Sequence, residues 1–136
     1  MLMKFTDLWT LRPLPQPGAV VMGDCCRITV LTSRLLRLEY DAQQRFCDSA
    51  TQMAICREFP LPAFEVRRDG ARLTLETEAV RLEYDGQPFS SEGLSVTLKG
   101  AYSAYTSVWH YGDAPDTLGG TALYGGACRR SGDLAR

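Results

Sequence analysis

The chain has 136 residues, which suits one domain but not a sandwich plus a catalytic barrel, because the barrel alone needs about 250 residues. Hydrophobic residues make up 45% and charged residues 23% of the sequence, which excludes a disordered chain, collagen-like repeats and a coiled coil. The 15 basic and 16 acidic residues give a net charge of −1, so the chain has no field that would attract nucleic acid or an anionic membrane.

The N-terminus and the cysteines bear on the compartment. Charges at Lys4 and Asp7 interrupt the first residues, which therefore resemble neither a secretory signal nor a membrane span. We expect a cytoplasmic protein. The 5 cysteines are an odd number and include no Cys-x-x-Cys pair, so free thiols are expected.

Residues 1–18 are expected to form an extended N-terminal arm. Pro13, Pro15 and Pro17 are spaced so closely that they favour extended backbone and exclude a helix. Trp9 is the expected anchor of this arm on the surface of the domain.

Beyond the arm, apolar residues recur at every second position, which is the pattern of half-buried strands. Asp69-Gly70 predicts a tight hairpin turn with positive φ, and Asp85-Gly86 closes a later strand. Such short strands separated by turns predict an all-β protein with an antiparallel β-sandwich over residues 19–121. The alternating segments are 26–30, 36–40, 72–76, 80–84 and 94–98.

Two segments are expected to lack strands. Residues 57–64 contain two prolines and predict an extended crossing between the sheets, with Phe59 and Phe64 as core anchors. After Gly112 the density of glycine, proline and aspartate predicts a loop. Residues 122–136 form an atypical tail, which we expect to be loosely ordered.

Two glutamates bear on hydrolytic chemistry. Glycoside hydrolysis uses a pair of carboxylates, and Glu39 and Glu83 are the candidates. Both alternate with core-facing leucine and tyrosine, which places them on solvated strand faces where cross-strand pairing with arginine explains them. Glu39 and Glu83 occupy the same position in a five-residue stretch that occurs twice, at 37–41 and at 81–85. Two similar amphipathic strands explain this recurrence better than an internal duplication does.

The single histidine, His110, lies between Trp109 and Tyr111. The three residues are a candidate carbohydrate contact, because aromatic rings offer broad apolar area with a polar tip. Packing at a strand end is the competing interpretation. A nucleophilic triad would also need a serine or cysteine on a strained turn, and the sequence contains no Gly-x-Ser-x-Gly. Residue chemistry alone yields no catalytic residue.

Metal and cofactor sites are not expected either. One histidine and scattered cysteines do not supply the four ligands of a zinc site. Gly119-Gly120-Thr121 lacks the remaining residues of a phosphate-binding loop or a dinucleotide fingerprint, and a tight turn explains the paired glycines.

Several sequence blocks follow one another in a recognisable order: 32–40, 46–48, 50–51, 57–60, 84–90, 93–95, 109–112 and 118–121. In this order they resemble the N-terminal domain of family 31 glycoside hydrolases, which include α-glucosidases and α-xylosidases. The resemblance implies a galactose-mutarotase-like β-sandwich that packs against a retaining catalytic (β/α)8 barrel and helps to shape its substrate pocket. The two catalytic aspartates of that barrel have no counterpart here, so the chain alone is expected to be inactive.

The resemblance ends after Thr121, as it would in a truncated or frame-shifted product. Two other functions stay open. The first is a stand-alone carbohydrate-binding module that contacts α-linked oligosaccharide through Trp109, His110 and Tyr111. The second is a sugar epimerase of mutarotase type, for which a single histidine is a poor supply of acid and base.

Self-association follows from the accessory-domain interpretation. Without its barrel, the sandwich would expose an apolar face, and such patches favour association. Light scattering is therefore expected to detect a dimer or a larger assembly, and a monomer at all concentrations would contradict this.

Overall fold

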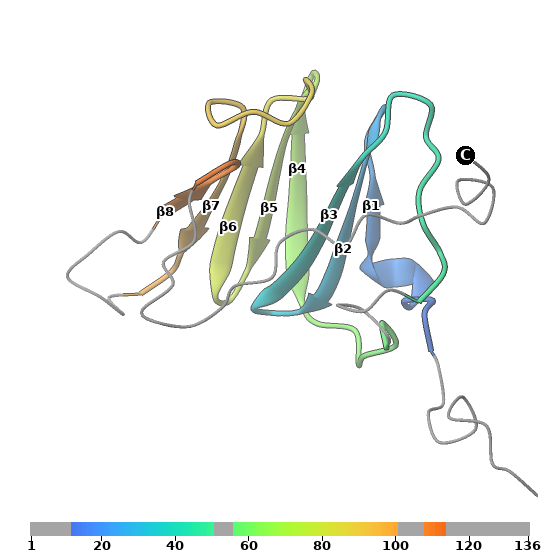
Figure 1. Ribbon diagram of the computed structural model, residues 1–136. Coiled ribbons are helices and arrows are strands. Elements are labelled where there is room, and N and C mark those ends of the chain that lie inside the picture. Colours follow the sequence, from blue (N-terminus) through green and yellow to red (C-terminus); the bar gives the residue numbers. More distant parts are fainter. Residues whose placement is uncertain (1–11, 51–55, 101–107, 114–136) are drawn as a thin grey trace, which may run out of the picture.

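The computed structural model describes residues 12–50, 56–100 and 108–113 of the chain. Its strands form one three-stranded sheet, with the order β1-β2-β3, and one five-stranded sheet, with the order β4-β5-β6-β7-β8. Figure 1 shows the two sheets as separate groups of strands. All strand pairs within them are antiparallel, and the predicted all-β sandwich class is confirmed.

The small sheet contains the first two alternating segments predicted from the sequence, 26–30 and 36–40. Its longest ladder joins β2 and β3, and this ladder has an irregularity between Val30 and Thr32. Alternation along the pleat places Ile28 and Leu38 on one face, and Arg27 and Glu39 on the other. The strands are β1 (Val20–Met22), β2 (Cys26–Thr32) and β3 (Leu35–Tyr40).

The large sheet is a meander in which each strand pairs with its neighbour in the sequence. Its first hairpin has the predicted turn, because Asp69 pairs with Arg72 and Gly70 has a φ of 58°. Gly86, which follows β6, also has a positive φ of 83°. The strands are β4 (Phe64–Asp69), β5 (Arg72–Thr77), β6 (Val80–Tyr84), β7 (Leu94–Leu98) and β8 (Val108–His110).

The hydrophobic core lies between the sheets and takes residues from both. Leu75 and Leu82 of the large sheet are fully buried, as are Ile28 and Val30 of the small sheet. Full burial of such a side chain contributes roughly 1.5–3 kcal/mol to the stability of the fold. The buried cluster comprises Val21, Cys26, Ile28, Val30, Leu73, Leu75, Leu82, Tyr84 and Leu94.

The segment that leads from the small sheet to the large one partly agrees with its prediction. Phe64 packs against the core. Phe59 does not belong to the core cluster and is only half-buried, so its predicted role as a core anchor is wrong. The backbone carbonyl of Phe59 instead accepts a hydrogen bond of 3.1 Å from Gln16 Nε2, which ties this segment to the arm.

The described part of the arm begins at Arg12, whose carbonyl accepts a hydrogen bond of 2.7 Å from the Arg57 backbone N–H. Pro17–Ala19 forms a short 3-10 helix, η2. The expectation that the prolines exclude a helix is wrong for this single turn, because proline is tolerated in the first turn of a helix. Trp9 and residues 122–136 lie outside the described residues.

Candidate functional site

The three predicted carbohydrate-contact residues lie on and beside the edge strand β8, but their side chains divide between its two faces. In the ladder between β7 and β8, Val96 pairs with Trp109 and Ser95 pairs with His110. Since successive side chains of a strand alternate between faces, Trp109 lies on the core face with Val96, and His110 lies on the outer face. The Tyr111 N–H donates to the Leu94 carbonyl at 3.0 Å and continues this pairing. Trp109 and Tyr111 thus share a side that His110 does not.

Burial decreases across the core face of the large sheet toward β8. The register aligns Leu75, Leu82, Val96 and Trp109 in one row across four strands. Leu75 and Leu82 are 0% exposed, Val96 is half-buried and Trp109 is 39% exposed. The small sheet therefore does not cover the end of the large sheet.

Two further exposed apolar side chains lie near this end. Leu98 is 46% exposed and Tyr111 is 44% exposed. Together with Trp109 they form what we call the β8 apolar edge. Its side chains continue the hydrophobic core toward the end of the large sheet.

Phe89 is the centre of an aromatic cluster that supports this edge. Its ring lies 5.4 Å from that of Tyr40, 5.5 Å from that of Tyr84 and 5.6 Å from that of Tyr111, measured between centroids. Tyr84 also donates a hydrogen bond of 2.6 Å to the Gln87 carbonyl, and burial raises the pKa of its hydroxyl. The cluster links both sheets to the start of the Tyr111 turn.

His110 takes part in the turn that ends β8. Asp113 Oδ2 accepts a hydrogen bond of 2.7 Å from the His110 N–H and lies 3.6 Å from His110 Nδ1. The Asp113 N–H donates to the His110 carbonyl at 3.0 Å, and Gly112 has a φ of 86°. These contacts fix a tight turn in which the His110 side chain lies on the outer face, whereas Tyr111 contacts the aromatic cluster.

The two candidate glutamates differ in environment, although each pairs with arginine. Glu83 forms an exposed ion pair of 2.9 Å with Arg81. Glu39 receives two hydrogen bonds from Arg27, at 2.7 and 3.0 Å, and also pairs with Arg37. Its side chain is only 12% exposed, so the predicted solvated face is correct for Glu83 and wrong for Glu39.

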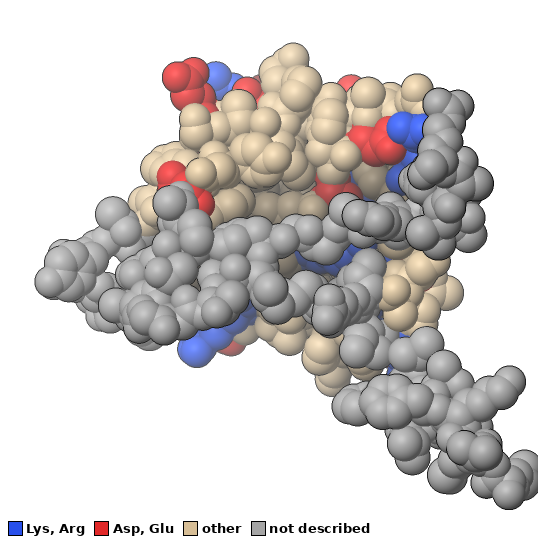
Figure 2. All heavy atoms as spheres, viewed as in Figure 1, with Lys and Arg blue, Asp and Glu red and all other residues tan. Residues whose placement is uncertain are grey.

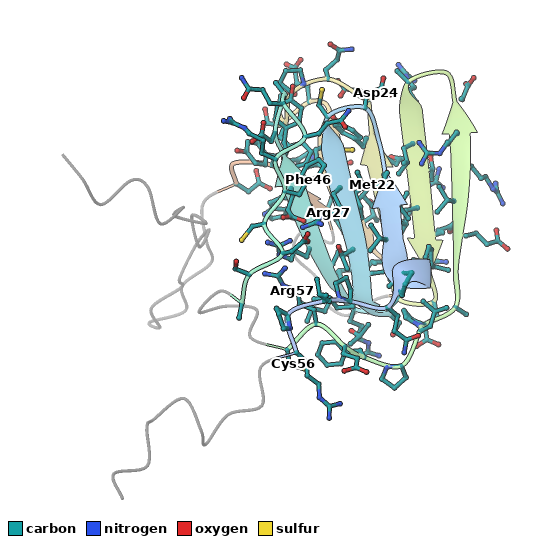
Figure 3. The ribbon with its side chains drawn as sticks, turned by 90° about the vertical axis from the view of Figure 1, so that its right-hand side faces the viewer. Met22, Asp24, Arg27, Phe46, Cys56 and Arg57 are labelled. Atoms are coloured by element: carbon teal, nitrogen blue, oxygen red, sulfur yellow. The ribbon has the colours of Figure 1, made fainter. Side chains whose placement is uncertain are left out.

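Loop residues 45–49 account for the burial of Glu39. The Cys47 N–H donates to Glu39 at 3.2 Å, and the Arg27 guanidinium lies 5.1 Å from the centre of the Phe46 ring (Figure 3). Burial alone would raise the pKa of Glu39, but the hydrogen bonds and charges of Arg27 and Arg37 outweigh it and lower that pKa. Glu39 is thus an ionised structural group near pH 7 and no proton donor there.

Two surface hollows lie elsewhere in the described part of the chain. One, of about 780 Å³, lies beside Phe64, Glu76 and Lys99. There Lys99 forms an ion pair of 3.0 Å with Glu76 and lowers the pKa of that carboxyl. The other, of about 290 Å³, is lined in part by Thr74 and Glu83 on the outer face. Neither hollow includes Trp109, His110 or Tyr111.

The cysteines partly differ from expectation. Cys25, Cys26 and Cys56 are free, whereas Cys47 is disulfide-bonded, so the expectation of free thiols is wrong at Cys47. Cysteine spacing alone does not determine which cysteines pair, so the bond at Cys47 could not be predicted from the sequence. Within the described residues, no three or more His, Cys, Asp or Glu side chains converge in a way that could hold a metal ion.

The surface and the comparisons with known proteins add little about function. On the face seen in Figure 2, charged side chains of both signs are interspersed among uncharged ones.

No helix in the described ranges has the length and apolar character needed to cross a membrane. No protein-family model and no curated protein matches the sequence. The class that the fold defines is an antiparallel β-sandwich with a partly exposed aromatic edge.

Proposed function

We propose that this chain is a non-catalytic N-terminal accessory domain of an α-glucosidase-like family 31 glycoside hydrolase. In this proposal the sandwich is of the galactose-mutarotase type and supports a (β/α)8 barrel, in the cytoplasm, whose substrate pocket it helps to shape. The observation that carries the proposal is the β8 apolar edge, where Trp109 and Tyr111 continue the core and are 39% and 44% exposed. Exposed apolar surface of this kind is characteristic of contacts between proteins or domains.

The chemistry of the described carboxylates is in keeping with a supporting role. Glu39 is held between Arg27 and Arg37, and Glu83 pairs with Arg81 on an open strand face. A retaining glycosidase needs two carboxyl groups about 5–5.5 Å apart across the scissile bond, one of which must carry a proton. Glu39, whose pKa is lowered, is unsuited to that acid role.

The proposal is tested on the coding DNA. Reading beyond the codon of Arg136 in all three frames is expected to reveal a (β/α)8 barrel. A polypeptide that joins this chain to the barrel is expected to hydrolyse p-nitrophenyl α-glucoside or α-xyloside, whereas the chain alone should leave both intact. Unrelated coding sequence in every frame would contradict the proposal.

A carbohydrate-binding module is the second candidate, favoured by the exposed rings of Trp109 and Tyr111 on one side of β8. Calorimetric titration with millimolar maltooligosaccharides separates the two functions. The accessory domain is expected to give no heat of binding. Saturable binding that Trp109→Ala abolishes would favour the module, provided that Leu61→Ala, a change at a 51% exposed leucine away from β8, retains it.

A further inference from the structure

Arg57 is a buried cation with an unused hydrogen-bond donor. The residue is 2% exposed, and its side chain is the largest of the fully buried ones among the described residues. Its Nη1 donates to the Cys47 carbonyl at 2.8 Å and its Nη2 to the Ser49 carbonyl at 2.7 Å. Its Nε is buried and has no hydrogen-bond partner among the residues that the structure describes. Buried polar groups are nearly always paired, so an unpaired guanidinium N–H in the interior requires an explanation.

The charges around Arg57 also lack balance. Arg27 and Arg37 lie nearby, and their partners are Glu39, which binds both of them, and Asp48, which binds Arg27 at 2.6 Å. None of the described ion pairs includes Arg57. Three guanidinium groups thus share two carboxylates, and burial together with the neighbouring Arg37 lowers the pKa of Arg57. An arginine stays charged all the same, because its ordinary pKa is far above neutral pH.

The guanidinium lies next to an exposed loop. Arg57 Nη2 donates to the carbonyl of Ser49, which is exposed, and the adjacent Asp48, which pairs with Arg27, has a side chain that is 61% exposed. Figure 3 shows Arg57 beside Arg27 and Phe46 on the small-sheet side of the molecule. The buried Nε thus belongs to a side chain that is bonded directly to an exposed loop residue.

We infer that Arg57 anchors a binding site for a small oxyanion, such as inorganic phosphate, sulfate or a simple carboxylate. One anionic oxygen would accept the hydrogen bond from Arg57 Nε and supply the missing negative charge among Arg27, Arg37 and Arg57. Arginine suits this task because its planar fork presents N–H donors to oxyanions in fixed geometry. The site is independent of the function proposed above.

The test measures thermal unfolding of the whole chain with sodium phosphate, sulfate or acetate, against sodium chloride of equal ionic strength. For at least one anion we expect a saturable rise in Tm of about 4 °C at a tenfold excess over the Kd. Arg57→Lys, which keeps the charge but lacks Nε–H, is expected to lose this rise. Arg67→Met, a change at an arginine whose side chain is 75% exposed, should keep it.

A further variant keeps the inference falsifiable if Arg57→Lys fails to fold. Asp48→Asn removes an exposed competing carboxylate and is expected to lower the Kd for the anion several-fold. The inference is overturned if no anion raises Tm beyond the chloride control. It is equally overturned if Arg57→Lys retains the full rise, or if Asp48→Asn leaves the Kd unchanged.

Discussion

Replacing Glu39 with glutamine is expected to lower the free energy of unfolding by about 3 kcal/mol at pH 7. The glutamate accepts hydrogen bonds from Arg27 and the Cys47 N–H and pairs with Arg37, all in a setting where its side chain is 12% exposed. Glutamine has the same shape but no charge, so two largely buried guanidinium groups would lose their shared counter-ion. Urea unfolding of the two proteins measures the difference.

The same substitution is expected to change the pH dependence of stability. The folded pKa of Glu39 lies below its ordinary value, which is about 4.3 in the unfolded chain. The stabilisation is therefore complete above that value and is lost as the pH falls through the folded pKa. Urea unfolding between pH 7 and pH 3 should show a decline in the original protein that is smaller in Glu39→Gln.

Glu83→Gln is the matched control, because Glu83 occupies the same place in the recurring stretch 81–85. Its ion pair with Arg81 is exposed on both sides, so a change below about 0.5 kcal/mol is expected. Equal losses in the two variants would refute the claim that loop residues 45–49 make the two glutamates different.

Phe89→Ala is expected to lower the free energy of unfolding by about 2 kcal/mol. The ring contacts Tyr40, Tyr84 and Tyr111 together, and its removal leaves a cavity between the sheets. We also expect a reduced near-ultraviolet circular dichroism signal, because three tyrosines lose a fixed neighbour. Urea unfolding and the dichroism spectrum measure the two effects.

Phe59→Ala is the control for this change. Phe59 is half-buried like Phe89 but is not among the residues packed against the core. A loss of about 1 kcal/mol or less is expected, with the near-ultraviolet spectrum preserved. If Phe59→Ala cost as much as Phe89→Ala, the aromatic cluster would have no special role.

Alternation predicted the longer strands well, because each buries one face and exposes the other. β1 and β8 were not predicted as strands, since three residues are too few to display a period of two. Residues 109–111 were grouped from the sequence as one candidate contact. The β8 ladder instead places Trp109 on one face of the sheet and His110 on the other. That separation follows from the ladder with β7, which no local pattern encodes.

Identical residues also acquired different environments. The stretches 37–41 and 81–85 have one sequence, yet Glu39 is enclosed and Glu83 is open. The difference arises from a loop that comes later in the sequence than Glu39 and folds back over it. Likewise, Phe89 follows a proline in a polar loop, and none of its neighbours in the sequence indicates that its ring contacts both Tyr40 and Tyr84.

Within each sheet, every described strand pairs with the strand next to it in the sequence, and this order influences how the chain folds. Every ladder joins strands that are consecutive in the sequence, so each hairpin closes over a short loop at little entropic cost. Contacts between distant residues are needed for the packing of one sheet on the other and for the bridge between Arg12 and Cys56. We therefore expect the two meanders to form first, and their docking around Phe89 to be the slow step that sets the folding rate.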